Sequence, residues 1–143
     1  MRDVDIAKEL LEKEQLALAI VKNGEIIFIS RDIGIKPLYT AVEEIKDELK
    51  GSSVADRVTG KAAAMLCEYA GIKELHTRLI SEKAIKVMDT TSILYYYDES
   101  SPYIKNRDKT GMCPVETLSL NVNNIYDLLQ GISNFLESLK KVC

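Results

Sequence analysis

Apolar residues in the first part of the chain form two closely spaced runs. Leu16–Val21 and Ile26–Ile29 flank the polar segment Lys22-Asn23-Gly24-Glu25. Asn-Gly between two apolar runs is the preferred type I′ turn, because both residues tolerate a positive φ. The pattern therefore predicts a β-hairpin. Both runs are apolar almost throughout, which predicts a sheet that is covered on both faces.

Helical periodicity flanks this hairpin. Residues 3–14 place their apolar side chains on one face, and Asp3 or Asp5 can cap the first turn through its carboxylate. Residues 37–49 repeat apolar side chains at helical spacing, and Pro37 suits the first helical position. We expect a helix on either side of the hairpin.

Strands and helices alternate through the middle of the chain. The expected elements, in order, are an extended segment over 52–58, a small-residue helix from Gly60 that ends before Gly71, a strand over 75–80, a helix capped by Ser81 that runs to Met88, and a strand over 92–97. Residues 98–113 are polar and lack periodicity, and a loop of that length is functional or mobile. A helix start at Pro114 and a long final helix capped by Asn124 complete the chain.

This order of elements predicts the fold class. A hairpin followed by alternating helices and strands is typical of an α/β protein with a mixed sheet in three α/β/α layers. The N-terminal hairpin and the long C-terminal helix are its distinguishing parts. No internal repeat or Pro/Gly-rich linker divides the chain, so we expect a single domain over residues 1–143.

Composition excludes several classes of function. Lys and Arg number 19 against 22 Asp and Glu, so a nucleic-acid binder held mainly by phosphate contacts is excluded. Cys67, Cys113 and Cys143 are odd in number and widely spaced, which argues against a disulfide framework. We expect no signal peptide, and the apolar runs are too short to span a membrane. We expect a cytoplasmic protein with reduced thiols and no membrane partner.

Thr59-Gly60-Lys61 lies where a strand gives way to a helix. A phosphate loop needs a glycine five residues before this one and a Ser or Thr after the lysine, whereas those positions are Ala55 and Ala62. The free N–H groups of the helix start still form a corner that favours an anion, with Lys61 adding a charge. The alternative is an ordinary helix start with a solvated lysine.

Asp56 precedes that corner, close to the end of its strand. Ligands of open α/β sheets bind beyond the carboxyl ends of the strands. Asp56 can therefore orient a ligand amine or act as a general base. A surface ion pair with Arg57 or a helix cap is the alternative.

Cys113 and Glu116 form the candidate reactive pair of the sequence. A cysteine at a helix N-terminus has its thiolate stabilised by the helix dipole, and Glu116, one turn on, can position it or exchange a proton. In the preceding loop, Asn106 and Arg107 offer bidentate recognition of carboxylates, phosphates or base edges. The alternatives are a buried cysteine with a capping glutamate and a solvated turn.

Metal chemistry has few candidate ligands. His76 is the single histidine, and the sequence contains no Cys-x-x-Cys pair. A zinc site needs three or four such ligands. We therefore expect neither a metal nor another cofactor.

Two segments carry a resemblance to a known family. Residues 54–63 (VADRVTGKAA) and 102–116 (PYIKNRDKTGMCPVE) resemble a small family that is catalogued as a domain of unknown function and assigned to the deaminase-like superfamily. The likeness covers almost the whole chain before the final helix. It implies a cytidine-deaminase-like fold.

The chain departs from true deaminases at the zinc ligands. Those enzymes hold zinc at a His/Cys-x-Glu helix start and a Pro-Cys-x-x-Cys helix start. The corresponding segments here are 59–62 (TGKA) and 81–84 (SEKA), which offer neither thiolate nor imidazole. The resemblance thus implies a pocket at two converging helix N-termini, lined by Asp56 and Lys61 together with Cys113 and Glu116, without classical deamination.

The favoured function is the binding of a small anionic or nucleotide-like molecule. Thr59, Gly60, Asn106 and Arg107 are the expected ligand-binding residues. Catalysis by Cys113 with help from the other pocket residues remains open. A non-catalytic sensor and a homo-oligomeric interaction module that uses the final helix are the alternatives.

Overall fold

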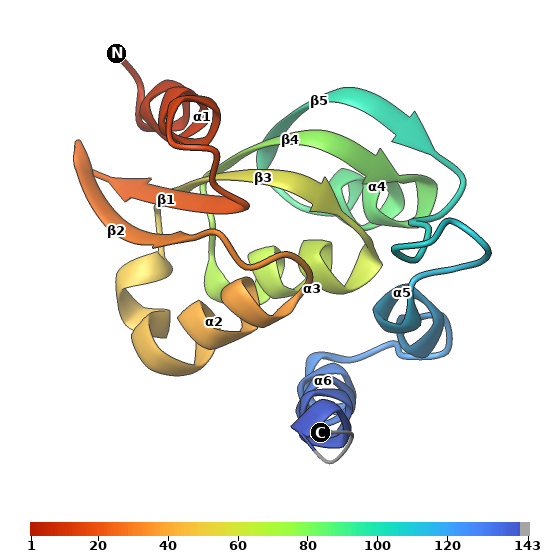
Figure 1. Cartoon of the computed structure of the whole chain (residues 1–143). Helices are drawn as coiled ribbons and strands as arrows, with labels where there is room; N and C mark the ends of the chain where they lie inside the picture. Colours follow the sequence, from red (N-terminus) through yellow and green to blue (C-terminus); the bar gives the residue numbers. More distant parts are fainter. Residues whose placement is uncertain (141–143) are drawn as a thin grey trace.

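A computed structural model describes residues 1–140, so Cys143 lies outside the described residues. Within them, one mixed sheet has five strands in the order β2-β1-β3-β4-β5 (Figure 1). The strands are β1 (Leu18–Lys22), β2 (Glu25–Ser30), β3 (Ser53–Thr59), β4 (Glu74–Ser81) and β5 (Leu94–Ser101). β1 is antiparallel to both β2 and β3, whereas β3, β4 and β5 are parallel. The predicted mixed sheet with an N-terminal hairpin is confirmed.

Helices cover the two faces unequally. α1 (Asp3–Lys13) lies alone on one face, and α2 (Lys36–Leu49), α3 (Lys61–Ala70) and α4 (Glu82–Asp89) lie on the other (Figure 1). α5 (Pro114–Ser119) and α6 (Ile125–Lys140) pack against α3 from outside. The arrangement is compatible with three α/β/α layers.

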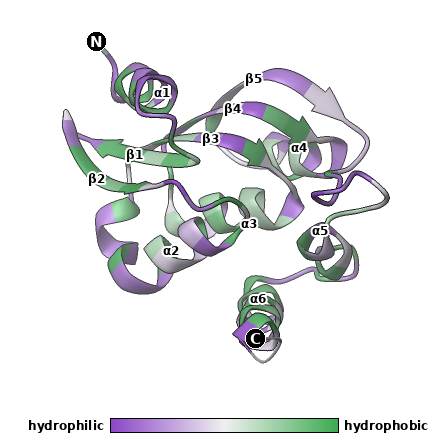
Figure 2. Cartoon of the chain, in the orientation of Figure 1, coloured by the Kyte–Doolittle hydropathy of each residue, from purple (hydrophilic) through white to green (hydrophobic). Residues whose placement is uncertain are grey.

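The core follows this division. Leu18, Ile20 and Val54 of the sheet join α2, α3 and α6 in the larger cluster, and Leu11 of α1 packs with Ala55 in a smaller one. β1 is buried almost throughout, and most of its residues are hydrophobic (Figure 2). The prediction that both hairpin strands are covered on both faces is wrong for β2, where Ile26 and Ile29 are exposed. β2 is the edge strand, and α1 contacts β1, β3 and β4 instead.

Several local predictions are confirmed in detail. Asn23 and Gly24 both have positive φ, as a type I′ turn requires, and Gly71 ends α3 in the left-handed conformation. Ser81 Oγ accepts a hydrogen bond from the N–H of Ala84 at 3.2 Å. At the start of α6, Asn124 Oδ1 accepts from Asp127 at 2.9 Å.

The predicted cap of α1 is wrong. Arg2 holds the N-cap position, and neither Asp3 nor Asp5 caps the helix. The Asp3 carboxylate instead accepts hydrogen bonds from the N–H of Asn23 at 2.8 Å and of Gly24 at 2.9 Å. The free N–H groups of the hairpin turn compete for this carboxylate, because the turn lies beside the start of α1.

α6 uses its apolar stripe inside the chain. Leu128 and Ile132 are fully buried in the larger core, with Phe135 and Leu136 packed against it. Its large exposed apolar side chains are Tyr126 and Leu139. The stripe therefore packs against the chain's own core. No helix within residues 1–140 has both the length and the apolar character needed to cross a bilayer.

Candidate functional site

A cavity of about 950 Å³ opens at the end of the sheet where β3 ends and β1 begins. Its apolar surface comes from both ends of the chain, with Leu18, Leu38 and Ala63 on one side and Phe135 and Leu136 of α6 on the other. Pockets of this size and character bind small organic molecules. Further walls are the segment that leads into α2 (32–37), the end of β3 (56–58), the loop 104–108 and the start of α5 (113–116).

Asp56 is the carboxyl group of β3 that lines this cavity. Burial raises the pKa of Asp56 from 3.8 to about 7, because a charged carboxylate is poorly solvated among apolar walls. The N–H groups of Val58 and Arg57 favour the charged form but do not offset the burial. Asp56 therefore changes charge near neutral pH.

Glu116 fills the anion corner that the sequence predicts at the start of α3. Its Oε1 accepts a hydrogen bond from the N–H of Lys61 at 3.0 Å, and its Oε2 accepts from the N–H of Ile104 at 2.5 Å. Only 3% of Glu116 is exposed. A Cβ at Gly60 would lie 2.9 Å from Glu116 Oε1, so the close approach needs glycine. We call this pair of bonds the Glu116 latch.

Lys61 turns away from the cavity. Its ammonium donates to the carbonyl oxygens of Ser119 and Val122, each at 2.8 Å. Burial, followed by the nearby charge of Lys83, lowers the pKa of Lys61. Lys61 thus links the start of α3 to the end of α5 through hydrogen bonds. Its ammonium group does not reach the cavity.

Cys113 and the loop before it lie at the cavity, together with Arg107 and Asn106. The N–H of Cys113 donates to the carbonyl of Ile104 at 2.8 Å, and the side chain is half-buried. Asn106 Oδ1 accepts from the N–H groups of Thr110 at 3.0 Å and Gly111 at 3.3 Å, which holds the loop in a turn. Asn106 therefore has a structural role in addition to its place at the cavity.

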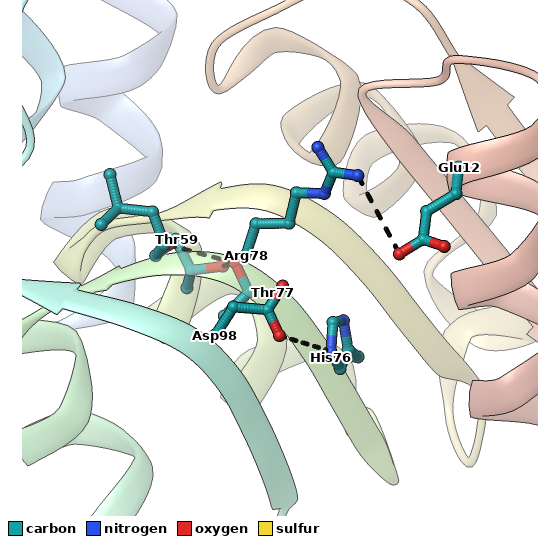
Figure 3. A network of polar contacts seen from close by, with 7 residues as sticks. Glu12, Thr59, His76, Thr77, Arg78 and Asp98 are labelled. Atoms are coloured by element: carbon teal, nitrogen blue, oxygen red, sulfur yellow. Dashed lines mark hydrogen bonds and ion pairs between the residues drawn. The ribbon is translucent and has the colours of Figure 1, made fainter.

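Thr59 lies away from the cavity, on the sheet. Its hydroxyl is buried and donates to Thr77 Oγ1 at 2.9 Å (Figure 3). In the same view His76 Nε2 lies 3.5 Å from Asp98 Oδ1. Burial is the main cause that lowers the pKa of His76. Across residues 1–140, no three His, Cys, Asp or Glu side chains gather to form a metal site.

The prediction that the helix starts at 59–62 and 81–84 converge on one pocket is wrong for the second of them. Residues 81–84 at the start of α4 do not line the cavity, whereas the starts of α2, α3 and α5 do. The reason is that α5 packs against the start of α3 and holds it through Glu116. The sequence analysis did not predict that α6 lines the cavity. An apolar stripe indicates that one face of a helix is buried, but it does not indicate what that face packs against.

Comparison with known proteins adds a family and a fold. The family described as "TM1506: Domain of unknown function (DUF1893)" matches residues 6–136. The crystal structure of a DUF1893 family protein (TM1506) from Thermotoga maritima at 2.70 Å resolution is similar, with 31% sequence identity and a TM-score of 0.85. The match covers 92% of this chain and 88% of that one. No curated protein sequence matches.

Proposed function

The chain belongs to the TM1506 family of domains of unknown function (DUF1893), and on that footing we propose that it binds a small nucleotide-like molecule in the cavity beside Asp56. The observation that carries the proposal is the partly buried carboxyl group of Asp56, which borders a large, mostly apolar cavity at the carboxyl end of β3. Ligands of α/β sheets bind at this end of the strands.

We place the fold among the cytidine-deaminase-like folds. Supporting this are the order helix, hairpin, helix, strand, and the sheet order β2-β1-β3-β4-β5 with β3, β4 and β5 parallel. The helix starts that carry zinc ligands in deaminases are Gly60-Lys61 and Ser81-Glu82 here. These residues offer no thiolate or imidazole, so the proposed role is binding and excludes zinc-dependent deamination.

The chemistry of the cavity favours an amino-substituted heterocycle. Contact with the apolar walls, above all with the aromatic ring of Phe135, favours the binding of a flat ring. The ionised carboxylate of Asp56 accepts two N–H groups from one edge of such a ring. Because the N–H groups of Val58 and Arg57 offset only part of the cost of burying this charge, a ligand that donates hydrogen bonds is bound more tightly than one that accepts them.

Calorimetric titration with the four common ribonucleosides tests this role. The Asp56→Asn variant is expected to lose about tenfold or more in affinity, because a hydrogen bond to a charged group is worth about 1.5–3 kcal/mol. For a ligand that donates hydrogen bonds to Asp56, the affinity of the wild-type protein is expected to rise as the pH increases through about 7, because Asp56 then ionises. Asp47→Asn, which alters an exposed carboxylate on α2, is the matched control. Equal affinities of the Asp56 variant and wild type, or no binding by any nucleoside, would contradict the proposal.

Chemistry at Cys113 is the second candidate, because its side chain lines the same cavity. We expect iodoacetamide to label Cys113 in the folded protein and to spare Cys67, which is 1% exposed and whose pKa burial raises strongly. A Cys143→Ser background confines the readout to these two thiols, and peptide mass spectrometry locates the label. A nucleoside that binds should slow the labelling. If Cys113 stays unlabelled, this candidate fails.

A further inference from the structure

A second hollow of about 490 Å³ lies on the α1 side of the sheet. Three arginines line it: Arg31 after β2, Arg57 on β3 and Arg78 on β4. Figure 3 shows Arg78 reaching from β4 toward Glu12 of α1, which is another wall of the hollow. Three guanidinium groups around one small space create a strongly positive surface.

Arg57 is the anchored member of this group. Its Nε donates to the carbonyl oxygen of Leu16, which holds the guanidinium in place and leaves its two terminal amino groups. No carboxylate within residues 1–140 lies within ion-pair distance of Arg57. A half-buried cation without a counterion favours an incoming anion.

The other two arginines have weak partners. Arg31 lies 3.8 Å from Glu14 and Arg78 lies 3.9 Å from Glu12, both near the limit of an ion pair. All four side chains are 45% to 65% exposed. Exposed pairs of this kind contribute between zero and about 1 kcal/mol, so a more highly charged anion displaces them readily.

The hollow adjoins the Asp56 cavity. Ala17, Ile33 and Arg57 line both spaces, because the segment after β2 crosses the end of the sheet from one face to the other. Successive residues of a strand point to opposite faces. Asp56 and Arg57 therefore present a carboxyl group to the cavity and a guanidinium to the hollow.

We propose that Arg31, Arg57 and Arg78 bind the phosphate groups of the nucleotide whose base occupies the Asp56 cavity. This inference rests on the proposed function and assigns the part of the ligand that the carboxyl group of Asp56 does not bind. The α3 corner cannot take that part, because Glu116 occupies it and Lys61 is already bonded to two carbonyls. Guanidinium groups match phosphate oxygens in bidentate geometry.

The test compares three probes by calorimetry: a ribonucleoside, its 5′-diphosphate and inorganic pyrophosphate. We expect the diphosphate to bind wild-type protein at least tenfold more tightly than the nucleoside. In Arg31→Gln and in Arg78→Gln the ratio of diphosphate to nucleoside affinity should fall by roughly tenfold. Lys86→Gln removes an exposed charge on α4 and should leave the ratio unchanged. Glu12→Gln removes a competing carboxylate and should raise it.

The outcomes separate the two proposals. A nucleoside that binds as tightly as its diphosphate, or a ratio insensitive to both arginine variants, overturns the phosphate site and leaves the base site standing. Pyrophosphate that binds wild type but neither arginine variant supports the phosphate site even if no nucleoside binds, in which case the base site fails. Failure of all three probes overturns both.

Discussion

Replacement of Glu116 by alanine is expected to lower the free energy of unfolding by about 3–5 kcal/mol, the largest loss among the changes considered. The variant leaves the N–H groups of Lys61 and Ile104 without the acceptors that the Glu116 latch provides. Each buried donor without a partner costs about 1–3 kcal/mol, and a bond to a charged group is worth more than a neutral one. Urea unfolding followed by far-ultraviolet circular dichroism measures the change.

Three further variants identify the cause of that loss. Glu116→Gln keeps the shape and one acceptor oxygen but turns an NH₂ group toward one of the two N–H donors, so an intermediate loss is expected. Gly60→Ala pushes on the same carboxylate through a Cβ 2.9 Å from Oε1 and should destabilise as well. Glu43→Ala removes an exposed carboxylate from α2 and controls for the charge. A loss below about 1 kcal/mol in Glu116→Ala would contradict the latch.

Replacement of Asp56 by asparagine is expected to stabilise the protein at pH 8 by up to about 4 kcal/mol. The pKa of Asp56 is about 7 in the folded protein against 3.8 for an ordinary carboxyl group. Between these values the folded state binds more protons than the unfolded state, so the contribution of Asp56 to stability falls as the pH rises. Above pH 7 the full penalty of a buried charge is present, and asparagine removes it.

The pH dependence of that gain is the decisive measurement. Urea unfolding at pH 8 and at pH 4 should show a large gain for Asp56→Asn at the higher pH and almost none at the lower. Asp47→Asn, on the exposed surface of α2, should show neither. A gain of equal size at both pH values would mean that charge burial is not its cause. A carboxyl group that weakens the fold while lining a cavity is typical of a ligand-binding residue, since function tolerates such a cost.

Local signals predicted most of the elements. The Asn23-Gly24 turn, the cap by Ser81 and the left-handed Gly71 each depend on a few neighbouring residues, and all three occur where the sequence places them. Alternation of strands and helices was enough for the mixed sheet. The burial of β2 was overestimated, because an apolar run does not reveal whether its strand is at the edge.

The candidate site was predicted less completely, because its contacts join distant parts of the chain. Asp3 binds a turn some 20 positions away in place of its own helix end. Lys61 has the sequence context of an anion-binding residue, yet its ammonium donates to one carbonyl at the end of α5 and to another just beyond it. Asp56, Cys113 and Arg107 do line one cavity, because the carboxyl end of β3 and the loop before α5 meet there.

The Glu116 latch also has a kinetic consequence. It joins positions 55 residues apart. Closing a loop of that length lowers the chain entropy before the hydrogen bond can form and offset this cost. The latch should therefore form late, after the sheet has assembled, on the native side of the folding barrier. Interactions of that kind slow unfolding and leave the folding rate almost unchanged. Because Ile104 and Glu116 are walls of the cavity, the lifetime of the latch would also limit how fast that side of the cavity could open to release the proposed ligand.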